Sequence, residues 1–330
     1  MVSFALTEEQ RILQETARRF VEKEVTPVAA HHDETGEFPW ALMQKAFDTG
    51  LINDSIPAEY GGGGLSCFET VLLAEEIAAG CAGVATSLLG NNLASTPIVL
   101  AGTEEQKRRF LGGLTSKLSF GAFGLTEPGA GSDAAGMTTM CRKDGDVYVL
   151  NGTKCFITNG GMADFHAKVP ARLRLGEECE RFKIAMRTLD RARPGVAALG
   201  VGVARAALEH SVRYAKERHT FGQRLANHQG LQFMLAEMAR DVEVSRLATW
   251  HAAWLIDQGK DATLQSSVSK LLATDTAMKV STDAVQLFGG YGYMKDYPVE
   301  KLMRDAKLLQ IYEGTNQIQR LVIARKILGD

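Results

Sequence analysis

The sequence of 330 residues predicts a mainly α-helical protein with a small β-sheet in the middle of the chain. Three observations support this fold class. Apolar residues recur at helical spacing early in the chain, strand-like runs with turn signals follow, and long helical stripes occupy the remainder. We therefore expect an N-terminal helical domain over residues 1–118, a middle β-domain over residues 119–181 and a C-terminal helical domain over residues 182–330.

The N-terminal part contains clear helix start signals. Thr7 and Gln10 have the spacing of a capping box, and Leu13 and Phe20 then fall on one helical face. The glycine-rich loop EYGGGGLSCFE precedes a second helix, which we expect over residues 68–79. This loop lacks the Lys-Ser/Thr of a phosphate-binding P-loop, so we interpret it as a plain connection.

The middle part is predicted to be a β-meander. The run LSFGAFGL is short, apolar and aromatic, and TTMCRKDGDVYVLNGTKCFIT contains three strand-like runs. Asp144-Gly145 and Asn151-Gly152 separate these runs, and both dipeptides are strong hairpin signals. On the third run, Phe156 and Thr158 would share one face of a strand. They would form either an aromatic platform beside a hydroxyl group or an ordinary edge strand.

Long helices dominate the C-terminal part. Leu231, Met238 and Val242 lie on one stripe of a helix that we expect to end at Gly259. A second long helix is expected over residues 262–288, and a short one near the C-terminus. Long helices joined by short loops indicate an antiparallel bundle.

Composition excludes several classes of function. The net charge of −2 and the absence of a basic tract argue against nucleic acid as a partner. The five cysteines form no CxxC pair, which favours a reducing compartment, either a bacterial cytoplasm or the mitochondrial matrix. The N-terminus shows no signal or transit pattern, and no apolar run reaches the roughly 18 residues of a membrane span. The histidines lack the spacing of metal ligands, so we expect no metal site.

The segment LTEPGAGSDAAG is a candidate cofactor loop. Its glycines allow successive backbone N–H groups to converge on an anion, and Thr126 and Ser132 add hydroxyl donors. It is not a GxGxxG motif that opens a helix, so a Rossmann site is a poor interpretation. From these residues alone, the loop is either a cofactor site or an ordinary turn.

A second candidate, KERHTFGQRLANHQG, lies where one long helix ends and another begins. It gathers Arg218, Thr220, Phe221, His228 and Gln229. In the simpler interpretation, its cations stabilise a helix C-terminus.

The segment IYEGT places Glu313 before a glycine. Gly314 disfavours a helix, and Thr315 is a good N-cap, so we expect Glu313 on a bend. Its carboxylate is either a capping charge or a base. Its immediate neighbours by themselves favour the capping role.

Seven stretches, in chain order, together resemble the acyl-CoA dehydrogenase family: LTEPGAGSD, NGTKCFITNGG, DRARPGVAA, YAKERHTFG, QLFGGYGY, YPVEKLMRDAK and IYEGTNQIQR. The resemblance implies a helical N-terminal domain, a middle β-domain and a C-terminal four-helix bundle domain. It also implies a homotetramer or dimer that holds FAD and passes electrons to an electron-transfer flavoprotein.

The resemblance further implies the reaction. A carboxylate removes the α-proton of a short- or medium-chain acyl-CoA thioester, flavin N5 takes the β-hydride, and trans-2-enoyl-CoA results. The match assigns the base to Glu313. Some family branches carry this glutamate elsewhere, but the corresponding position here is Ala192. The stretch GNNLASTP is similar to the medium-chain branch.

The same match implies the binding residues, carried over position by position. Thr158 would lie near flavin N5. The ADP half of FAD, from a neighbouring subunit, would be met by Arg218, His219 and Thr220, with His228 and Gln229, and by the run from Gln286 to Gly290. The full cofactor set is Phe123, Leu125, Thr126, Gly131, Ser132, Phe156, Ile157, Thr158, Arg218, His219, Thr220, Phe221, His228, Gln229, Gln286, Gly289, Gly290, Thr315, Asn316 and Gln317. The substrate set is Ser132, Asp190, Arg193, Tyr312 and Gly314.

The chain departs from the family after NGGMAD, where most of the second half of the β-domain is absent. Cys179 and Arg181 replace glycines of the family pattern. Several interpretations follow: an active enzyme with a truncated β-domain, a catalytically impaired scaffold that binds FAD poorly, or a sequence that omits a segment. An acyl-CoA oxidase-like flavoenzyme is a further alternative.

Overall fold

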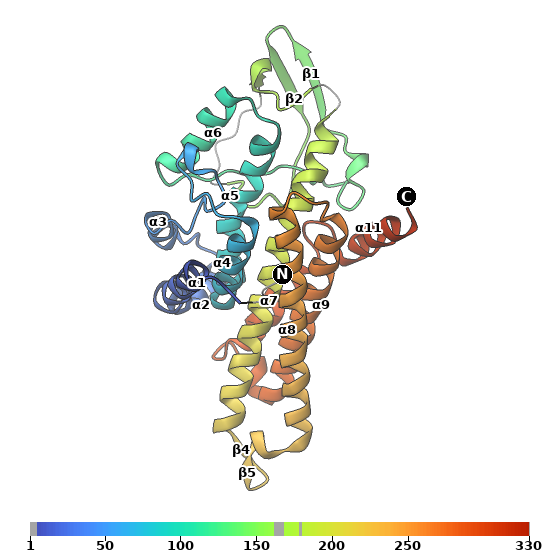
Figure 1. Ribbon diagram of the computed structural model, residues 1–330. Helices are drawn as coiled ribbons and strands as arrows, with labels where there is room; N and C mark the ends of the chain where they lie inside the picture. Colours follow the sequence, from blue (N-terminus) through green and yellow to red (C-terminus); the bar gives the residue numbers. More distant parts are fainter. Residues whose placement is uncertain (1–4, 162–167, 178–179, 330) are drawn as a thin grey trace. The chain divides into compact units, whose positions relative to one another are not determined.

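The computed structural model describes residues 5–161, 168–177 and 180–329, and helices dominate it (Figure 1). This confirms the predicted fold class. The α-helices are α1 (Glu8–Phe20), α2 (Thr26–Thr35), α3 (Trp40–Asp48), α4 (Cys67–Gly80), α5 (Ala82–Ala101), α6 (Glu104–Ser116), α7 (Arg181–Glu217), α8 (Gln229–Asp257), α9 (Thr263–Phe288), α10 (Val299–Leu309) and α11 (Asn316–Leu328). The strands are β1 (Met140–Asp144), β2 (Val147–Asn151), β3 (Lys168–Pro170), β4 (His219–Thr220) and β5 (Gln223–Arg224).

The chain divides into two compact units, each described by itself below. Unit 1 comprises residues 1–39, 66–85 and 193–330, and unit 2 comprises residues 40–65 and 86–192.

Capping boxes begin three of the described helices. Thr7 accepts a hydrogen bond from the Gln10 N–H, and the Gln10 side chain bonds back to the Thr7 N–H. This is the capping box predicted from the sequence. The same reciprocal pattern begins α4 at Ser66 and α6 at Thr103. Each box satisfies N–H groups that a helix start would otherwise leave without a partner.

In unit 1, α8 and α9 run side by side, with α7 from Arg193 onward against them (Figure 1). Two glycines of α7 permit its close packing. A Cβ on Gly200 would lie 2.8 Å from the Ala273 carbonyl oxygen of α9, and one on Gly202 would lie 2.3 Å from the Glu75 carbonyl oxygen of α4. As predicted, α8 ends close to Gly259, which has a left-handed φ of +66°.

Unit 2 contains an antiparallel sheet in the order β1-β2-β3, within the described residues. The hairpin predicted at Asp144-Gly145 is confirmed, with Asp144 opposite Val147 and a left-handed Gly145. Every residue of β1 is exposed, so this edge strand is uncovered in the chain. The unit's apolar core lies elsewhere, where Ile56 and Leu111 pack together.

Two strand predictions in this region are wrong. Residues 119–126 form no strand and only an isolated bridge follows, between Glu127 and Ala130. Residues 153–158 do not pair as a third strand, because Phe156 has a left-handed φ of +55° that breaks an extended run. Instead β3 occupies the free edge of β2.

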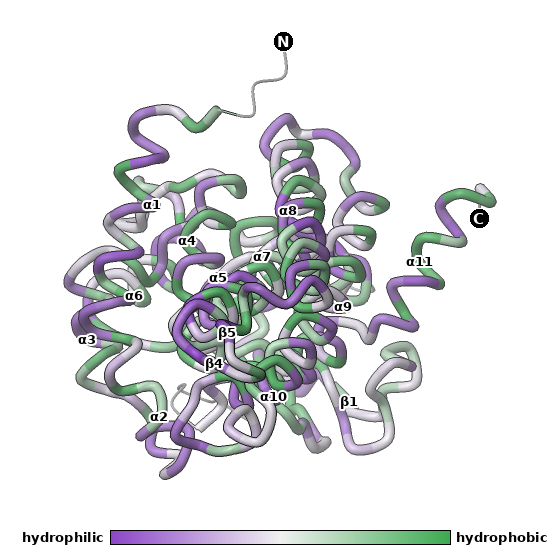
Figure 2. Tube along the Cα trace, turned by 90° about the horizontal axis from the view of Figure 1, so that it is seen from below, coloured by the Kyte–Doolittle hydropathy of each residue, from purple (hydrophilic) through white to green (hydrophobic). Residues whose placement is uncertain are grey.

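The C-terminal helix α11 begins against α9 and then projects away from it (Figure 2). Its outer half carries large exposed apolar side chains, Leu321, Ile327 and Leu328. No helix within the described residues is both long and apolar enough to cross a bilayer.

Candidate functional site

Glu313 lies on a sharp turn between α10 and α11. Its φ is +51° and that of Gly314 is +91°, so two successive residues are left-handed. The predicted bend is therefore confirmed. Glycine tolerates this conformation, whereas for glutamate it costs free energy that the surroundings must supply. Thr315 begins α11 as its N-cap and accepts a hydrogen bond from the Ile318 N–H.

Gln319 secures this turn from the first part of α11. Its side-chain amide donates to the Glu313 carbonyl oxygen over 3.3 Å and to the Gly314 carbonyl oxygen over 2.9 Å. A Cβ on Gly314 would lie only 2.7 Å from the same nitrogen, so this position has little space for a larger residue. Gln319 is fully buried, and its place fixes where the Glu313 backbone can lie.

The Glu313 carboxyl group is in an environment that favours its protonated form. Its Oε2 atom is buried and has no hydrogen-bond partner in the described structure. Burial raises the pKa of this carboxyl to about 7, although the positive charges of Arg193 and Lys270 act in the opposite direction. A carboxyl group that titrates near neutral pH has the property required of a general base.

The main-chain N–H of Glu313 donates to no main-chain carbonyl within the described residues. A buried or partly buried N–H normally has a partner. The same residue thus carries a carboxyl group and a main-chain N–H with no main-chain acceptor among the described residues, two groups that suit abstraction of a proton beside a carbonyl whose oxygen gains charge.

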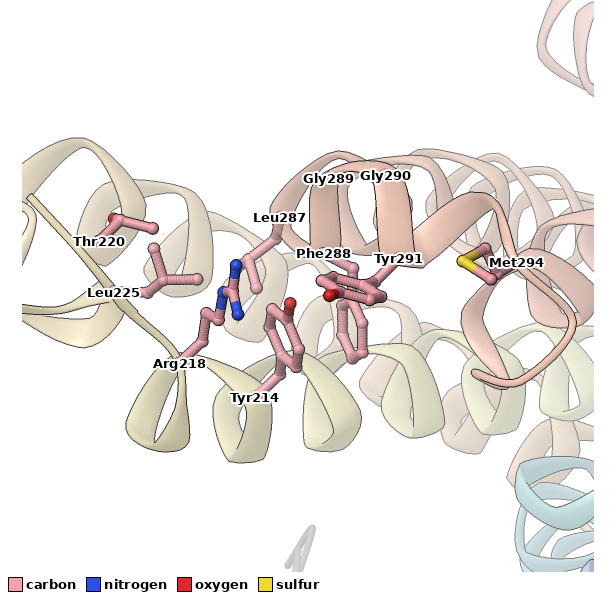
Figure 3. Close-up of a pocket in the computed structure, with 10 residues that line it drawn as sticks. All are labelled: Tyr214, Arg218, Thr220, Leu225, Leu287, Phe288, Gly289, Gly290, Tyr291 and Met294. Atoms are coloured by element: carbon pink, nitrogen blue, oxygen red, sulfur yellow. The ribbon is translucent and has the colours of Figure 1, made fainter.

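A pocket of about 490 Å³ lies in unit 1 at the end of the bundle where α7 and α9 finish (Figure 3). Arg218 and Thr220, from the end of α7 and the β4 strand, meet Gly289 and Gly290 after α9. The sequence predicted these four residues to share a cofactor site. Its other lining residues are Tyr214, Leu225, Leu287, Phe288, Tyr291 and Met294.

Aromatic rings form one wall of this pocket. Tyr214 stacks on Phe288 with ring centroids 4.0 Å apart, and the Arg218 guanidinium lies 5.4 Å from the centroid of the Tyr291 ring. Figure 3 shows Tyr214 and Arg218 reaching toward Phe288 and Tyr291. A cation beside stacked rings provides contacts for a phosphate and for a planar base.

The remaining residues of this predicted group lie on or after the β4–β5 hairpin. Phe221 and Gly222 form its turn with left-handed φ values, and the Phe221 side chain is 97% exposed. The ring of His228 lies 6.2 Å from that of Phe221. His219, Gln229 and Gln286 are exposed and do not line the pocket.

The side chain of Asn316 is engaged within the protein. Its amide oxygen accepts from Lys270, and its amide nitrogen donates to Thr274 and Asp275. Both N–H donors of its amide are therefore used inside the chain. Its neighbour Gln317 is exposed.

In unit 2, two predicted flavin segments lie beside each other. The Cys155 N–H donates to the Thr126 carbonyl over 3.0 Å, and Lys154 donates to the Leu125 carbonyl over 2.8 Å. Phe156 is 94% exposed, so it forms no part of the unit's core. Phe123, Ile157 and Thr158 are half-buried, and Gly131 and Ser132 are exposed.

The predicted substrate residues occupy three places, one of which is the exposed loop at Ser132. Tyr312 and Gly314 flank Glu313 in the α10–α11 turn. Asp190 and Arg193 lie on α7, where Pro194 follows without ending the helix. Arg193 is buried and donates to the Ser267 hydroxyl over 3.2 Å.

The sequence did not indicate two lysines that the structure connects to these segments. Lys270 lies beneath the Glu313 turn, and Lys154 pairs with Glu127 beside the Thr126 segment. A signal for Lys270 exists in retrospect, because Ser266, Lys270 and Thr274 recur every four residues on a helix otherwise rich in small and apolar residues.

Family models match nearly the whole chain. They are the N-terminal domain of acyl-CoA dehydrogenase at residues 7–117, the middle domain at residues 122–234 and the C-terminal domain at residues 182–328. The chain belongs to the acyl-CoA dehydrogenase family, whose members are FAD-dependent oxidoreductases.

An acyl-CoA dehydrogenase of Bacillus subtilis is 40% identical, with 98% of this chain and 99% of that protein covered. Its alignment extends over 375 positions, more than the 330 residues of this chain, so the relative contains residues with no counterpart here.

Two solved structures are also similar to this chain. Butyryl-CoA dehydrogenase from Megasphaera elsdenii has 38% identity and a TM-score of 0.96, with 99% of this chain and 100% of that chain covered. A chain from the structure of the electron transferring flavoprotein of Acidaminococcus fermentans has 39% identity and a TM-score of 0.97, with full coverage of both.

Proposed function

We propose that this protein catalyses the FAD-dependent α,β-dehydrogenation of a short- or medium-chain acyl-CoA thioester to the trans-2-enoyl-CoA, with Glu313 as the base. The observation that carries the proposal is the Glu313 turn. The Glu313 carboxyl group has a buried Oε2 atom without a partner and a pKa of about 7. The main-chain N–H of the same residue has no main-chain acceptor among the described residues.

The chemistry explains why this arrangement is needed. An α-proton of a thioester is far too weakly acidic for an ordinary carboxylate in water, so the enolate charge must be stabilised as it forms. The Glu313 N–H is a suitable donor to the thioester oxygen, and the raised pKa makes the carboxylate a stronger base than an exposed glutamate. Tyr312 and Gly314 border the same turn, where glycine permits close approach of a substrate.

The residues that line the pocket of unit 1 are chemically suited to the ADP half of FAD. Arg218 offers a cation for a pyrophosphate, Thr220 a hydroxyl donor, and Gly289 and Gly290 have open space where a Cβ would stand. We assign these residues, together with the other members of the predicted set near them, to the ADP half of the FAD of a neighbouring subunit. In unit 2, we assign the flavin half to the Thr126 and Thr158 segments. Bound FAD would supply the acceptor for the hydride.

We propose a homotetramer or dimer, supported by the exposed Phe221 at the hairpin and by the apolar side chains on the outer half of α11. An electron-transfer flavoprotein is the proposed electron acceptor, and the similarity to the Acidaminococcus chain supports it. We also keep two predictions from the sequence as proposals. One is the division into three domains with limits at residues 118 and 181, and the other is a reducing cellular compartment.

The test compares the visible spectrum of the purified protein before and after anaerobic addition of butyryl-CoA or octanoyl-CoA. A yellow protein that substrate bleaches is expected. Glu313→Gln should retain FAD and ligand binding but lose bleaching, whereas Glu237→Gln, an exposed glutamate on α8, should behave as the wild type. Bleaching of Glu313→Gln at a comparable rate would remove Glu313 as the base.

The same experiment separates the alternatives. Fast reoxidation in air after bleaching would indicate an oxidase. A folded protein that cannot be reconstituted with FAD would indicate a non-catalytic scaffold, an alternative motivated by the small uncovered sheet and by the longer relatives.

A further inference from the structure

Lys270 is a fully buried cation in the first third of α9. It lies between Ser266 and Thr274 at intervals of four residues, and both of these neighbours are also fully buried. The three side chains therefore form a polar stripe on one face of the helix.

A buried ammonium group is costly unless its N–H donors and its charge are compensated. Burial lowers the pKa of Lys270 to about 8, while the charges of Glu313 and Asp275 favour its protonated form. Nζ donates to the Gly314 carbonyl oxygen over 2.9 Å and to Asn316 Oδ1 over 2.8 Å. Both partners belong to the segment that follows Glu313.

These bonds connect α9 to the left-handed turn. The Gly314 carbonyl oxygen accepts from Lys270 and from Gln319, so donors from two helices hold one main-chain atom. Asn316 is in turn fixed by Thr274 and Asp275 of α9. A strained backbone persists only where its surroundings hold it in several ways, and here Lys270 contributes two of the contacts.

The charge of Lys270 acts on Glu313 without occupying its carboxylate. The hydrogen bonds of the ammonium go to Gly314 and Asn316, and Glu313 Oε2 remains without a partner. Lys270 nevertheless lowers the pKa of Glu313, as Arg193 of α7 does. The other charged groups of the neighbourhood are Asp275 of α9 and Arg320 of α11, which pair with each other over 3.0 Å.

We propose that Lys270 is a positioning residue for the base. Its ammonium group holds the left-handed Glu313–Gly314 turn through the Gly314 carbonyl and Asn316, and its positive charge favours the ionised form of the carboxylate against the effect of burial. The proposal rests on the proposed function, because it assigns Lys270 a task only if Glu313 removes a proton.

The test separates charge from hydrogen bonding in the FAD-loaded protein. Lys270→Gln removes the charge but keeps an N–H donor, and Lys270→Met removes both. Lys279→Gln on the same helix is the control, because Lys279 is exposed and pairs with Asp241 and Asp283. The rate of bleaching by butyryl-CoA is measured in single turnovers across pH 5.5–9, together with the FAD content.

In both neutral variants the acidic limb of the rate profile should shift to higher pH by about one unit, because a cation that favours the ionised form of Glu313 is lost. Lys270→Met should also lower the maximal rate roughly tenfold, because the turn loses its tie to α9. A purely structural lysine would change FAD content or maximal rate and leave the limb in place. Limbs that coincide with the wild type in both variants would overturn the proposal.

Should neither neutral variant fold, Lys270→Arg decides. It retains a cation beside Glu313, so the limb should stay in place, and a limb that rises with the charge kept would overturn the proposal. The Glu313→Gln variant tests the proposed function separately, because bleaching of its flavin by substrate would contradict that function. If Glu313→Gln does not bleach but the acidic limbs of the Lys270 variants match the wild type, only the role of Lys270 is contradicted.

Discussion

Lys154 donates a hydrogen bond of 2.8 Å to the carboxylate of Glu127, and the same ammonium donates to the Leu125 carbonyl oxygen over 2.8 Å. Glu127 also accepts from the N–H groups of Thr138 and Thr139, which precede β1. One buried carboxylate thus holds the candidate flavin loop, the start of the hairpin and the segment after β2 together. The hydrogen bond from Lys154 is the main reason that the pKa of Glu127 lies well below its usual range.

Glu127→Gln should weaken FAD binding by about tenfold, because a neutral amide cannot match the charged hydrogen bond and the loop then loses its preferred conformation. Titration of FAD into reconstituted protein, followed by flavin fluorescence, measures this. Asp144→Asn is the matched control, since the side chain of Asp144 forms an exposed pair with Arg142 in the same sheet. Equal FAD affinity in the Glu127 variant and the control would contradict the assigned role.

Arg205→Met should destabilise unit 1 by about 3–5 kcal/mol, because Arg205 pairs with both Glu75 and Glu76, and each carboxylate is almost fully buried. Arg246 still pairs with Glu75 and Arg18 with Glu76 in this variant, so the two buried carboxylates keep part of their charge compensation. Urea unfolding measured by circular dichroism tests the prediction.

The control for this variant is an arginine from an exposed pair. Arg240 is 61% exposed beside Asp241, and Arg240→Met should change the free energy of unfolding by no more than about 0.5 kcal/mol. If Arg205→Met were as mild as the control, the buried network would contribute little to stability.

Gly202→Ala should cost about 3 kcal/mol of unfolding free energy, although alanine is the better helix former. A Cβ at this position would lie 2.3 Å from the Glu75 carbonyl oxygen, so α7 and α4 would have to separate. Gly113→Ala on α6 meets no atom within 4 Å and should stabilise by about 0.5–1 kcal/mol. Thermal denaturation of both variants checks the opposite signs.

Glu313→Gln should stabilise the protein more at pH 8 than at pH 5. The folded-state pKa of Glu313 is about 7, above the ordinary glutamate value of 4.5, so the folded state holds this proton more tightly than the unfolded state. Stability therefore falls as pH rises from 4.5 through 7, by on the order of 3 kcal/mol, and glutamine avoids this loss. Melting temperatures of wild type and variant across this window measure the difference, and parallel curves would contradict the raised pKa.

Local sequence signals predicted what depends on neighbouring residues. The capping box at Thr7, the helix end near Gly259, the hairpin at Asp144-Gly145 and the bend at Glu313 all follow from the backbone preferences of a few adjacent residues. The same signals failed at residues 153–158. A left-handed Phe156 ends the extended run there, and β3, from farther along the chain, pairs with β2 instead.

By itself, the sequence determined the helical fold class, the family through its ordered motifs, and the position of the candidate base. Tertiary structure decided the environment of that base. Burial of Glu313 and the approach of Lys270 and Arg193 depend on side chains that lie 43 and 120 positions away in the sequence. Desolvation and charge act through space, so no reading of IYEGT alone could distinguish a capping carboxylate from one with a pKa near 7.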